Sequence, residues 1–229
     1  MLYTVLGLPT LAKAISCWMV DRYDSPEGVY LRVIDYKSSQ QTLDAARTWW
    51  GLQLQLLLYL DVCTHAIPGA KPAGAFYFYV ANPLVESETD AAALVEDKLR
   101  QVFQLKGITL NDVEIVSAMD EGSVPCVLPS LYQKNGELKK LAKALDAQQF
   151  AALLTHAREV AVGLADRLFG GETEIAPTRD QSRTSCDFCD YRAICRFDCQ
   201  SPEAPFRTVP DMSMEQLRAE LDASTKEVQ

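Results

Sequence analysis

The chain has 229 residues, of which 48% are hydrophobic and 23% are charged, a composition typical of a soluble globular protein. No apolar run approaches the ~18 residues of a membrane span, and the N-terminus lacks the pattern of a signal peptide, so we expect a cytoplasmic protein. The net charge of −9 argues against a free-standing DNA-binding protein, because affinity for a polyanion comes largely from Lys and Arg. Any DNA would have to be delivered by a partner.

The first half of the chain predicts a strand-rich core with one long helix. The segment 24–28 contains Pro and Gly and is typical of a hairpin turn between two apolar segments. The aromatic and small residues that precede Asn82-Pro83 favour a central strand. After residues 1–14, which have no clear pattern, we expect strands at 15–23 and 29–37, a helix at about 43–63 and a strand at 73–81.

The second half predicts more helix. Residues 147–169 are strongly amphipathic and are followed by Gly170-Gly171, which favour the end of a helix. His156 lies on this helix and is more simply explained as a surface or core residue than as a catalyst. Elsewhere we expect a helix at 89–103, short strands at 113–118 and 173–177, and an acidic, peripheral tail at 202–229. The expected division is an undefined stretch at 1–14, a core at 15–182 and a C-terminal segment at 183–229.

The strand at 29–37 ends in an acid and a base. Side chains alternate between the two faces of a strand, so Leu31, Val33, Asp35 and Lys37 share one side. A carboxylate can hold a hard cation such as Mg²⁺, while a nearby ammonium can orient or deprotonate an attacking water and offset charge on a phosphorane. The pattern favours metal-dependent phosphodiester hydrolysis, although a solvated ion pair at a strand end explains the same two residues.

Two polar side chains interrupt the apolar face of the helix expected at 43–63. Gln55 and Tyr59 lie one turn apart among leucines. A buried amide needs hydrogen-bonding partners, so a structural role beside a site and simple core packing of Tyr59 are both compatible with this pattern.

Four of the seven cysteines lie within fourteen residues near the C-terminus. Cys186, Cys189 and Cys195 are spaced so that three thiolates can surround one metal centre, and Cys199 follows closely. Four thiolates also satisfy tetrahedral Zn²⁺, and spacing alone does not separate the two possibilities. The apolar residues among them are expected to form a shell around the metal: Phe188, Tyr191, Ile194 and Phe197.

The strand end Asp35-Tyr36-Lys37, the pair Gln55 and Tyr59, and the cysteine segment together resemble the RecB-like branch of the PD-(D/E)xK nucleases. Residues 30–39 are similar to the AddB/RexB group within that branch, and the resemblance covers about 20–207. It implies an α/β, restriction-endonuclease-like fold with a mixed central sheet flanked by helices. It also implies that Asp35 and the carbonyl of Tyr36 bind Mg²⁺ and that Lys37 assists the water. Gln55 is then expected to place the substrate or the catalytic lysine, and Tyr59 to contact the DNA backbone or brace the site.

The same family carries a second metal-binding aspartate on the preceding strand, and Asp21 is the first candidate for it. If the hairpin turns about Pro26, however, Asp21 lies opposite Leu31 and residue 17 or 18 lies opposite Asp35. The two carboxylates are then four residues of strand apart, ~13 Å, which is too far to share an ion. Aligned without a gap, Trp18 takes the place of the first family aspartate. Either a bulge brings Asp21 to the metal or this copy has lost a ligand.

For the cysteines, the resemblance implies a [4Fe-4S] cluster on Cys186, Cys189 and Cys195 that staples the C-terminal segment to the core. The fourth family cysteine lies far upstream and has no counterpart here. Either Cys199 or Cys17 substitutes for it or the cluster is incomplete, and we favour Cys199 because it is close by. Zn²⁺ is the alternative occupant.

The resemblance implies hydrolysis of single-stranded DNA by a Mg²⁺-dependent exonuclease module, fed by an AddA-like helicase subunit in double-strand-break repair and recombination. The abrupt start of the chain suggests a piece of a longer subunit. Two alternatives stay open. One is a catalytically impaired, nuclease-like scaffold, which Trp18 and the acidic charge favour. The other is a zinc-binding interaction domain, which explains the cysteines alone.

Overall fold

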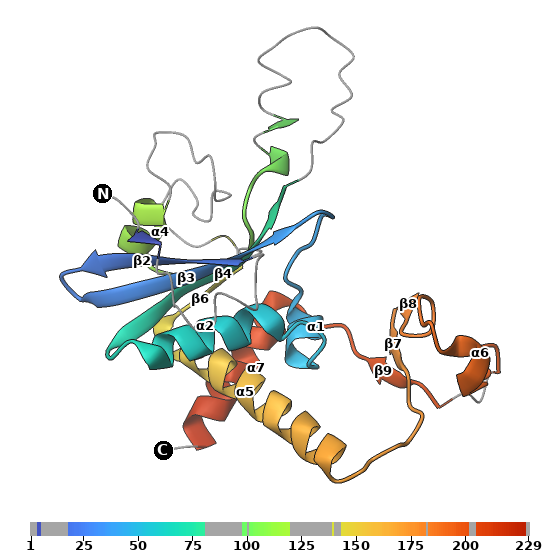
Figure 1. Cartoon of the computed structure of the whole chain (residues 1–229). Helices are drawn as coiled ribbons and strands as arrows, with labels where there is room; N and C mark the ends of the chain where they lie inside the picture. The colour runs from blue at the N-terminus through green and yellow to red at the C-terminus, as the bar shows by residue number, and fades with distance from the viewer. Residues whose placement is uncertain are drawn as a thin grey trace, which may run out of the picture.

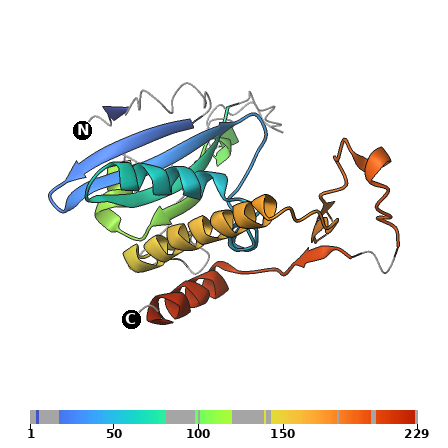
Figure 2. The ribbon, with the colours of Figure 1, turned by 60° about the horizontal axis from the view of Figure 1, so that its bottom comes forward.

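The computed structural model describes residues 18–80, 98–99, 101–119, 139, 143–181, 183–201 and 205–227, and the backbone of 4–5. These residues form an α/β body from which a thin extension projects (Figures 1 and 2). No helix within those ranges is both long and apolar enough to span a membrane.

The described strands of the body form one mixed sheet in the order β1-β2-β3-β4-β5-β6. β3 and β4 are parallel, as are β5 and β6, while the other neighbouring strands are antiparallel. The expectation of a mixed central sheet is therefore confirmed. The strands are β1 Thr4–Val5, β2 Trp18–Ser25, β3 Gly28–Lys37, β4 Ala70–Tyr79, β5 Lys106–Leu110 and β6 Ala144–Leu145.

The helix expected at 43–63 is two helices, α1 Ala45–Trp49 and α2 Gln55–Ala66. Between them Gly51 adopts a φ of +81°, a left-handed conformation that side chains with a Cβ disfavour. A Cβ at this position would also lie 2.9 Å from the Val160 side chain. The break redirects the chain and leaves α2 across β3 and β4, with Gln55 in its first turn.

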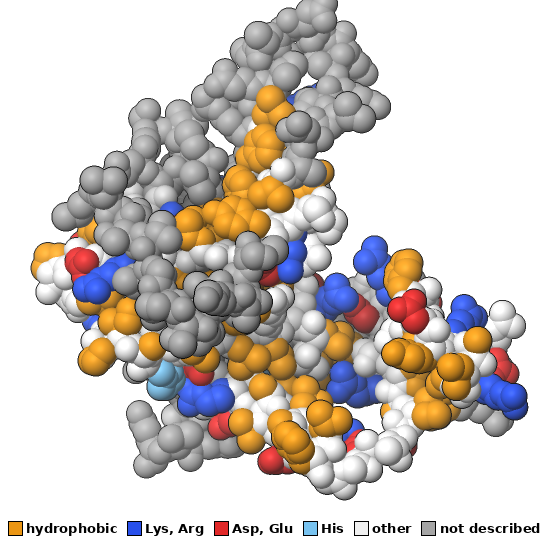
Figure 3. Space-filling model, viewed as in Figure 1, with side chains coloured by type: hydrophobic (Ala, Val, Ile, Leu, Met, Phe, Trp, Pro, Cys, Tyr) orange, Lys and Arg blue, Asp and Glu red, His pale blue; other side chains and the backbone are white. Residues whose placement is uncertain are grey.

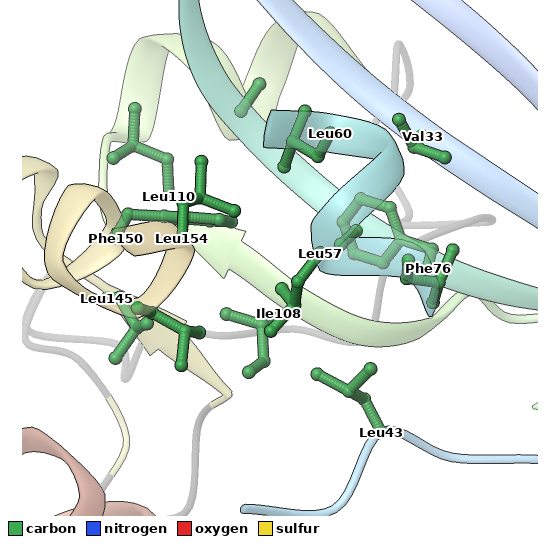
Figure 4. Packing of buried hydrophobic residues seen from close by; sticks show 14 of the residues in the cluster. Val33, Leu43, Leu57, Leu60, Phe76, Ile108, Leu110, Leu145, Phe150 and Leu154 are labelled. Carbon is green, nitrogen blue, oxygen red and sulfur yellow. The ribbon is translucent and has the colours of Figure 1, made fainter. Parts of the chain in front are cut away.

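Helices cover both faces of the sheet. α2 and α5 Ala147–Phe169 lie on one face, and α7 Met214–Glu227 packs against α5 (Figures 1 and 2). α4 Val113–Met119 lies on the opposite face. Each large apolar side chain buried between these layers contributes about 1.5–3 kcal/mol. Figure 4 shows part of this core, including Val33, Leu43, Leu57, Leu60, Ile108, Leu110, Leu145, Phe150 and Leu154.

The second half of the chain confirms the predicted long helix and corrects the two predicted short strands. The helix at 147–169 has the predicted bounds. The strand expected at 113–118 is wrong, because this segment is α4 and the strand β5 precedes it. The strand expected at 173–177 lies later, at β7 Thr178–Asp180. The helix expected at 89–103 falls mostly outside the described residues.

The C-terminal tail is not peripheral. α7 buries Leu217 and Leu221 completely, and its Asp222 accepts a hydrogen bond of 2.9 Å from Gln149 of α5. Leu217 and Leu221 are four residues apart and therefore lie on one face of the helix. The tail thus belongs to the core and returns the chain to the body after the extension.

The extension lies between α5 and α7 in the sequence. It contains a three-stranded sheet in the order β8-β7-β9 and the short helix α6. Arg47 of α1 pairs with Asp180 of β7 at 3.0 Å, which ties the extension to the body. The remaining elements are β8 Arg183–Thr184, α6 Arg192–Cys195 and β9 Arg207–Val209.

One buried ion pair joins α2 to α5 and carries a stability prediction. Asp61 is 5% exposed and accepts hydrogen bonds of 2.9 and 2.6 Å from Arg158. We expect Asp61→Asn to lower the free energy of unfolding by about 2 kcal/mol, because hydrogen bonds between charged groups are lost while Arg158 stays partly solvated. Denaturant titration measures this change. The matched control is Glu172→Gln in the exposed Arg167–Glu172 pair, and equal effects of the two variants would contradict the prediction.

Candidate active site

Asp35 and Lys37 lie at the carboxyl end of β3, beside the same end of the parallel strand β4. Asp35 is 2% exposed, and Lys37 Nζ lies 2.9 Å from Asp35 Oδ2. In β4 the residues paired with them are Tyr77 and Tyr79. Carboxyl ends of parallel strands are common ligand positions, because the chain leaves the sheet there and opens a crevice. The predicted placement of an acid and a base on one face at a strand end is confirmed.

Helix α2 adds a second pair of polar groups to this corner of the sheet. Gln55 Nε2 donates a hydrogen bond of 2.8 Å to the hydroxyl of Tyr59. The ring of Tyr59 stacks on Trp18 with centroids 4.8 Å apart. Trp18 is in turn the direct antiparallel partner of Asp35. The expected pair of Gln55 and Tyr59 exists, but Gln55 is exposed at the surface of the site, not buried in the core.

Sequence reasoning missed Tyr77 and Arg47 as neighbours of the site. Tyr77 is 5% exposed. Burial raises the pKa of its phenol, the negative charge of Asp35 raises it further, and Arg47 lowers it. Lys37 Nζ lies 5.8 Å from the centre of the Tyr77 ring. Nothing in the local sequence links Tyr77 to Asp35, since the pairing comes from the parallel register of two strands.

Asp21 lies on the other face of the sheet. Its antiparallel partner is Arg32, one residue from the expected Leu31. Arg32 Nε donates a hydrogen bond of 2.8 Å to Asp21, and Arg32 Nη1 donates one of 3.3 Å to the carbonyl of Met119 in α4. Burial and then the charge of Asp21 raise the pKa of Tyr36, whose side chain shares this face. The prediction that Asp21 and Asp35 share a metal ion is wrong for this arrangement.

Three buried polar atoms at the site have no hydrogen-bond partner among the described residues. Asp35 Oδ2 and Arg47 Nε have only their ion pairs with Lys37 and Asp180, and Trp18 Nε1 has none. A buried carboxylate oxygen without hydrogen bonds is costly, and a bound cation or donor would stabilise it. Mg²⁺ fits this oxygen, since it is often held by one or two carboxylates with water and substrate phosphate as the other ligands. Trp18 occupies the position opposite Asp35 and supplies no ligand atom.

Two hollows meet at Lys37. Both are lined by Lys37, Tyr77 and residues 39–42. The larger, about 990 Å³, continues past Gln55 toward the extension. The smaller, about 460 Å³, lies on the other side of Lys37. Figure 3 shows Lys and Arg side chains on this side of the molecule, between the body and the extension.

The cysteine segment brings its four thiols near one another. The pKa of the Cys186 thiol is raised by desolvation, then by a hydrogen bond with Cys199 and by the charges of Cys199, Cys189 and Cys195. Within the described ranges, however, no three His, Cys, Asp or Glu side chains are arranged closely enough to hold a metal ion. The donor set suits a thiolate-bound metal, although the thiols lie short of liganding geometry.

The expected apolar shell around these thiols is wrong. Phe188, Tyr191 and Ile194 are 94%, 72% and 80% exposed. Phe197 instead packs edge-on against Phe206, with ring centroids 5.1 Å apart. Short segments such as this have too few neighbours to bury their apolar side chains, so sequence alone overestimated the shell.

The mixed sheet flanked by helices, with an acid and a base at the end of a parallel strand, defines a nuclease-like α/β core. Residues 19–196 match the PD-(D/E)XK nuclease superfamily, and the chain belongs to that superfamily. The match begins one residue after Trp18. The family predicted from Asp35, Lys37, Gln55 and Tyr59 is therefore confirmed.

Individual relatives narrow the comparison from the superfamily to one kind of protein. The chain is 40% identical over 191 residues to the ATP-dependent helicase/deoxyribonuclease B subunit of Moorella thermoacetica, covering 80% of this chain and 17% of that protein. It is 34% identical over 237 residues to the protein of the same name from Bacillus thuringiensis, covering 94% and 20%. It is 36% identical over 190 residues to the protein of that name from Geobacillus kaustophilus, and the match covers 78% of this chain and 16% of that protein. The chain thus spans at most 20% of the length of these relatives.

Proposed function

We propose that this chain is a Mg²⁺-dependent module that hydrolyses single-stranded DNA and works with an AddA-like helicase subunit, as an exonuclease in double-strand-break repair. The observation that carries the proposal is the cluster of Asp35, Lys37, Gln55 and Tyr59 at one corner of the sheet. The superfamily and the name of its relatives support the reaction and the partner. The net charge of −9 supports delivery of the strand by another protein.

Each side chain has a role that its position supports. Asp35 and the carbonyl of Tyr36 would hold Mg²⁺, which when bound supplies Lewis-acid stabilisation of the phosphate. Lys37, 2.9 Å from Asp35, orients the attacking water and offsets charge on the phosphorane. Gln55 and Tyr59, joined by their 2.8 Å hydrogen bond, place the phosphate from the helix side. Because the described residues offer one carboxylate beside Lys37, metal binding depends strongly on the oxygen atoms of the substrate.

The direct test uses single-stranded oligonucleotides labelled at either end, with Mg²⁺ or with EDTA, and with or without an AddA-like helicase subunit. We expect shortening only with Mg²⁺, and more of it with the helicase. The labelled end that is lost first gives the polarity. A chain that leaves the strand intact under every condition argues for the second candidate below.

The second candidate is a catalytically impaired scaffold that keeps the fold to guide DNA or dock a partner. Two observations favour it: Trp18 occupies the place opposite Asp35, and Asp21 is paired with Arg32 on the other face. The two candidates differ in one experiment. A scaffold binds single strands without cutting them, and gains cleavage when a carboxylate replaces Trp18.

We also propose that Cys186, Cys189, Cys195 and Cys199 hold a [4Fe-4S] cluster that staples the extension. Cys199 is close enough to Cys186 to raise the pKa of its thiol, which supports the choice of Cys199 as the fourth ligand, although Cys199 Sγ donates to the carbonyl of Phe197 at 3.7 Å. The cluster would act structurally, because the segment has few buried apolar side chains of its own to stabilise it.

Elemental analysis of anaerobically purified protein tests the cluster. We expect about four iron atoms per chain with matching acid-labile sulfide, and we expect Cys199→Ser to lose most of the iron. Cys63→Ala, which removes a buried thiol of α2, is the control and keeps its iron. Stoichiometric zinc without iron would overturn the cluster in favour of a zinc site.

A further inference from the structure

The smaller hollow beside Lys37 differs in charge from the chain as a whole. Its described lining contains Lys98, Lys106 and Lys37, which pairs with Asp35 at 2.9 Å, and it contains no carboxylate, although the chain has a net charge of −9. The larger hollow holds three basic and three acidic side chains in its described lining, and Arg47 and Asp180 among them are paired at 3.0 Å. The smaller hollow is therefore the side of Lys37 that favours an anion.

The strand register places two of these lysines on either side of β4. Lys37 in β3 pairs with Tyr79, and Lys106 in β5 pairs with Tyr77. Lys106 Nζ donates to the carbonyl of Gln101 at 3.4 Å, a long hydrogen bond that a phosphate can replace. Lys98 is exposed at the rim of the same hollow. Lys37 and Lys106 thus lie on the two strands that flank β4, and Lys98 lines the same hollow.

The rest of the lining suits a single strand better than a duplex. Tyr77, Phe78 and Tyr79 all line the hollow, but Tyr77 is 5% exposed and Phe78 packs edge-on against Tyr36, so Tyr79 is the ring that a base can reach. Aromatic rings among basic side chains are typical of single-strand sites, where bases stack on rings and phosphates meet Lys or Arg. A volume of about 460 Å³ lies in the range of small-molecule pockets.

We propose that the smaller hollow is the subsite for the nucleotides next to the scissile phosphate, with Lys98 and Lys106 as phosphate contacts. This inference rests on the proposed function, since it takes Lys37 as the position of cleavage. The strand passes from the larger hollow over Lys37 and enters the smaller one. The two lysines hold the strand and take no part in the chemistry.

Binding measured in EDTA separates this subsite from cleavage. We follow the fluorescence anisotropy of a labelled oligothymidylate as salt rises from ~50 to ~200 mM. For Lys98→Ala/Lys106→Ala we expect weaker binding and a salt slope smaller by about 1.4, that is, about 0.7 for each lost phosphate contact. Across this range the affinity of the unchanged chain then falls about sevenfold more than that of the variant.

Two further variants make the result specific. Lys71→Ala/Lys226→Ala removes the same charge at the far end of β4 and on α7, and it should keep the original slope. Lys98→Arg/Lys106→Arg keeps both positive charges and should show the salt slope of the unchanged chain. Equal slopes for the hollow and control variants, or no binding by the unchanged chain, overturn the subsite whether or not the chain cleaves DNA. Altered slopes without Mg²⁺-dependent cleavage reject the nuclease instead and leave a strand-binding hollow.

Discussion

Asp35→Asn is expected to abolish Mg²⁺-dependent cleavage while leaving the fold intact. The carboxylate is 2% exposed and pairs with the partly exposed Lys37 at 2.9 Å, so an amide of the same shape keeps the packing but loses this ion pair. Removing it takes away the one carboxylate that the described residues place beside Lys37. We expect activity to fall by at least about a hundredfold, with a smaller loss in the free energy of unfolding than in Asp21→Asn, because Lys37 is more exposed to solvent than Arg32.

Lys37→Ala is expected to show the same loss of activity. Lys37 is partly exposed, so its removal keeps the packing of the core, although Asp35 loses its 2.9 Å ion pair and some stability is lost with it. Cleavage of a labelled single strand and denaturant unfolding, measured on the same preparations, give both quantities.

Asp21→Asn is the matched control and should behave in the opposite way. The Asp21–Arg32 pair is buried and joins β2 to β3 on the face away from Asp35, so breaking it costs about 3 kcal/mol of stability. Any cleavage by the folded fraction should persist. Loss of cleavage with full stability in Asp21→Asn would show that Asp21 reaches the metal after all, through a register unlike the one described.

Trp18→Asp is expected to strengthen Mg²⁺ binding and to raise cleavage. The direct antiparallel partner of Asp35 is the position from which a second carboxylate can reach the same ion, because opposed residues share a face with Cβ atoms about 4.5–5.5 Å apart. We expect Mg²⁺ to bind about tenfold more tightly or better, and cleavage to rise with it. The variant also loses the stacking of Trp18 on Tyr59, worth about 0.5–1.5 kcal/mol.

The control for Trp18→Asp is Trp18→Asn, which loses the same ring and has the same size but no charge. Calorimetric titration with Mg²⁺ compares the two, and the oligonucleotide assay follows activity. Equal metal affinity in both variants would mean that position 18 does not face the ion. Cleavage by Trp18→Asp but not by the unchanged chain identifies the chain as an impaired copy.

Sequence patterns predicted correctly those features that depend on residues close together in the chain. The end of β3 follows from strand alternation, which puts Asp35 and Lys37 on one face. The Gln55–Tyr59 hydrogen bond follows from helical spacing, and α5 follows from its amphipathic period and its glycines. Two features that the sequence predictions missed also have local signals. Gly51 marks the break between α1 and α2, and the spacing of Leu217 and Leu221 marks α7 as a core helix.

The sequence by itself determined the superfamily, the acid and base of the site, and the helix that accompanies them, because each depends on residues within one strand or one helical turn. Only the tertiary structure decided which face Asp21 occupies, that Trp18 stands opposite Asp35, and that Tyr77 and Lys106 lie beside Lys37. The physical reason is register. A shift of one residue between paired strands moves a side chain to the other face of the sheet, and register is set by the turn and the packing of the whole core.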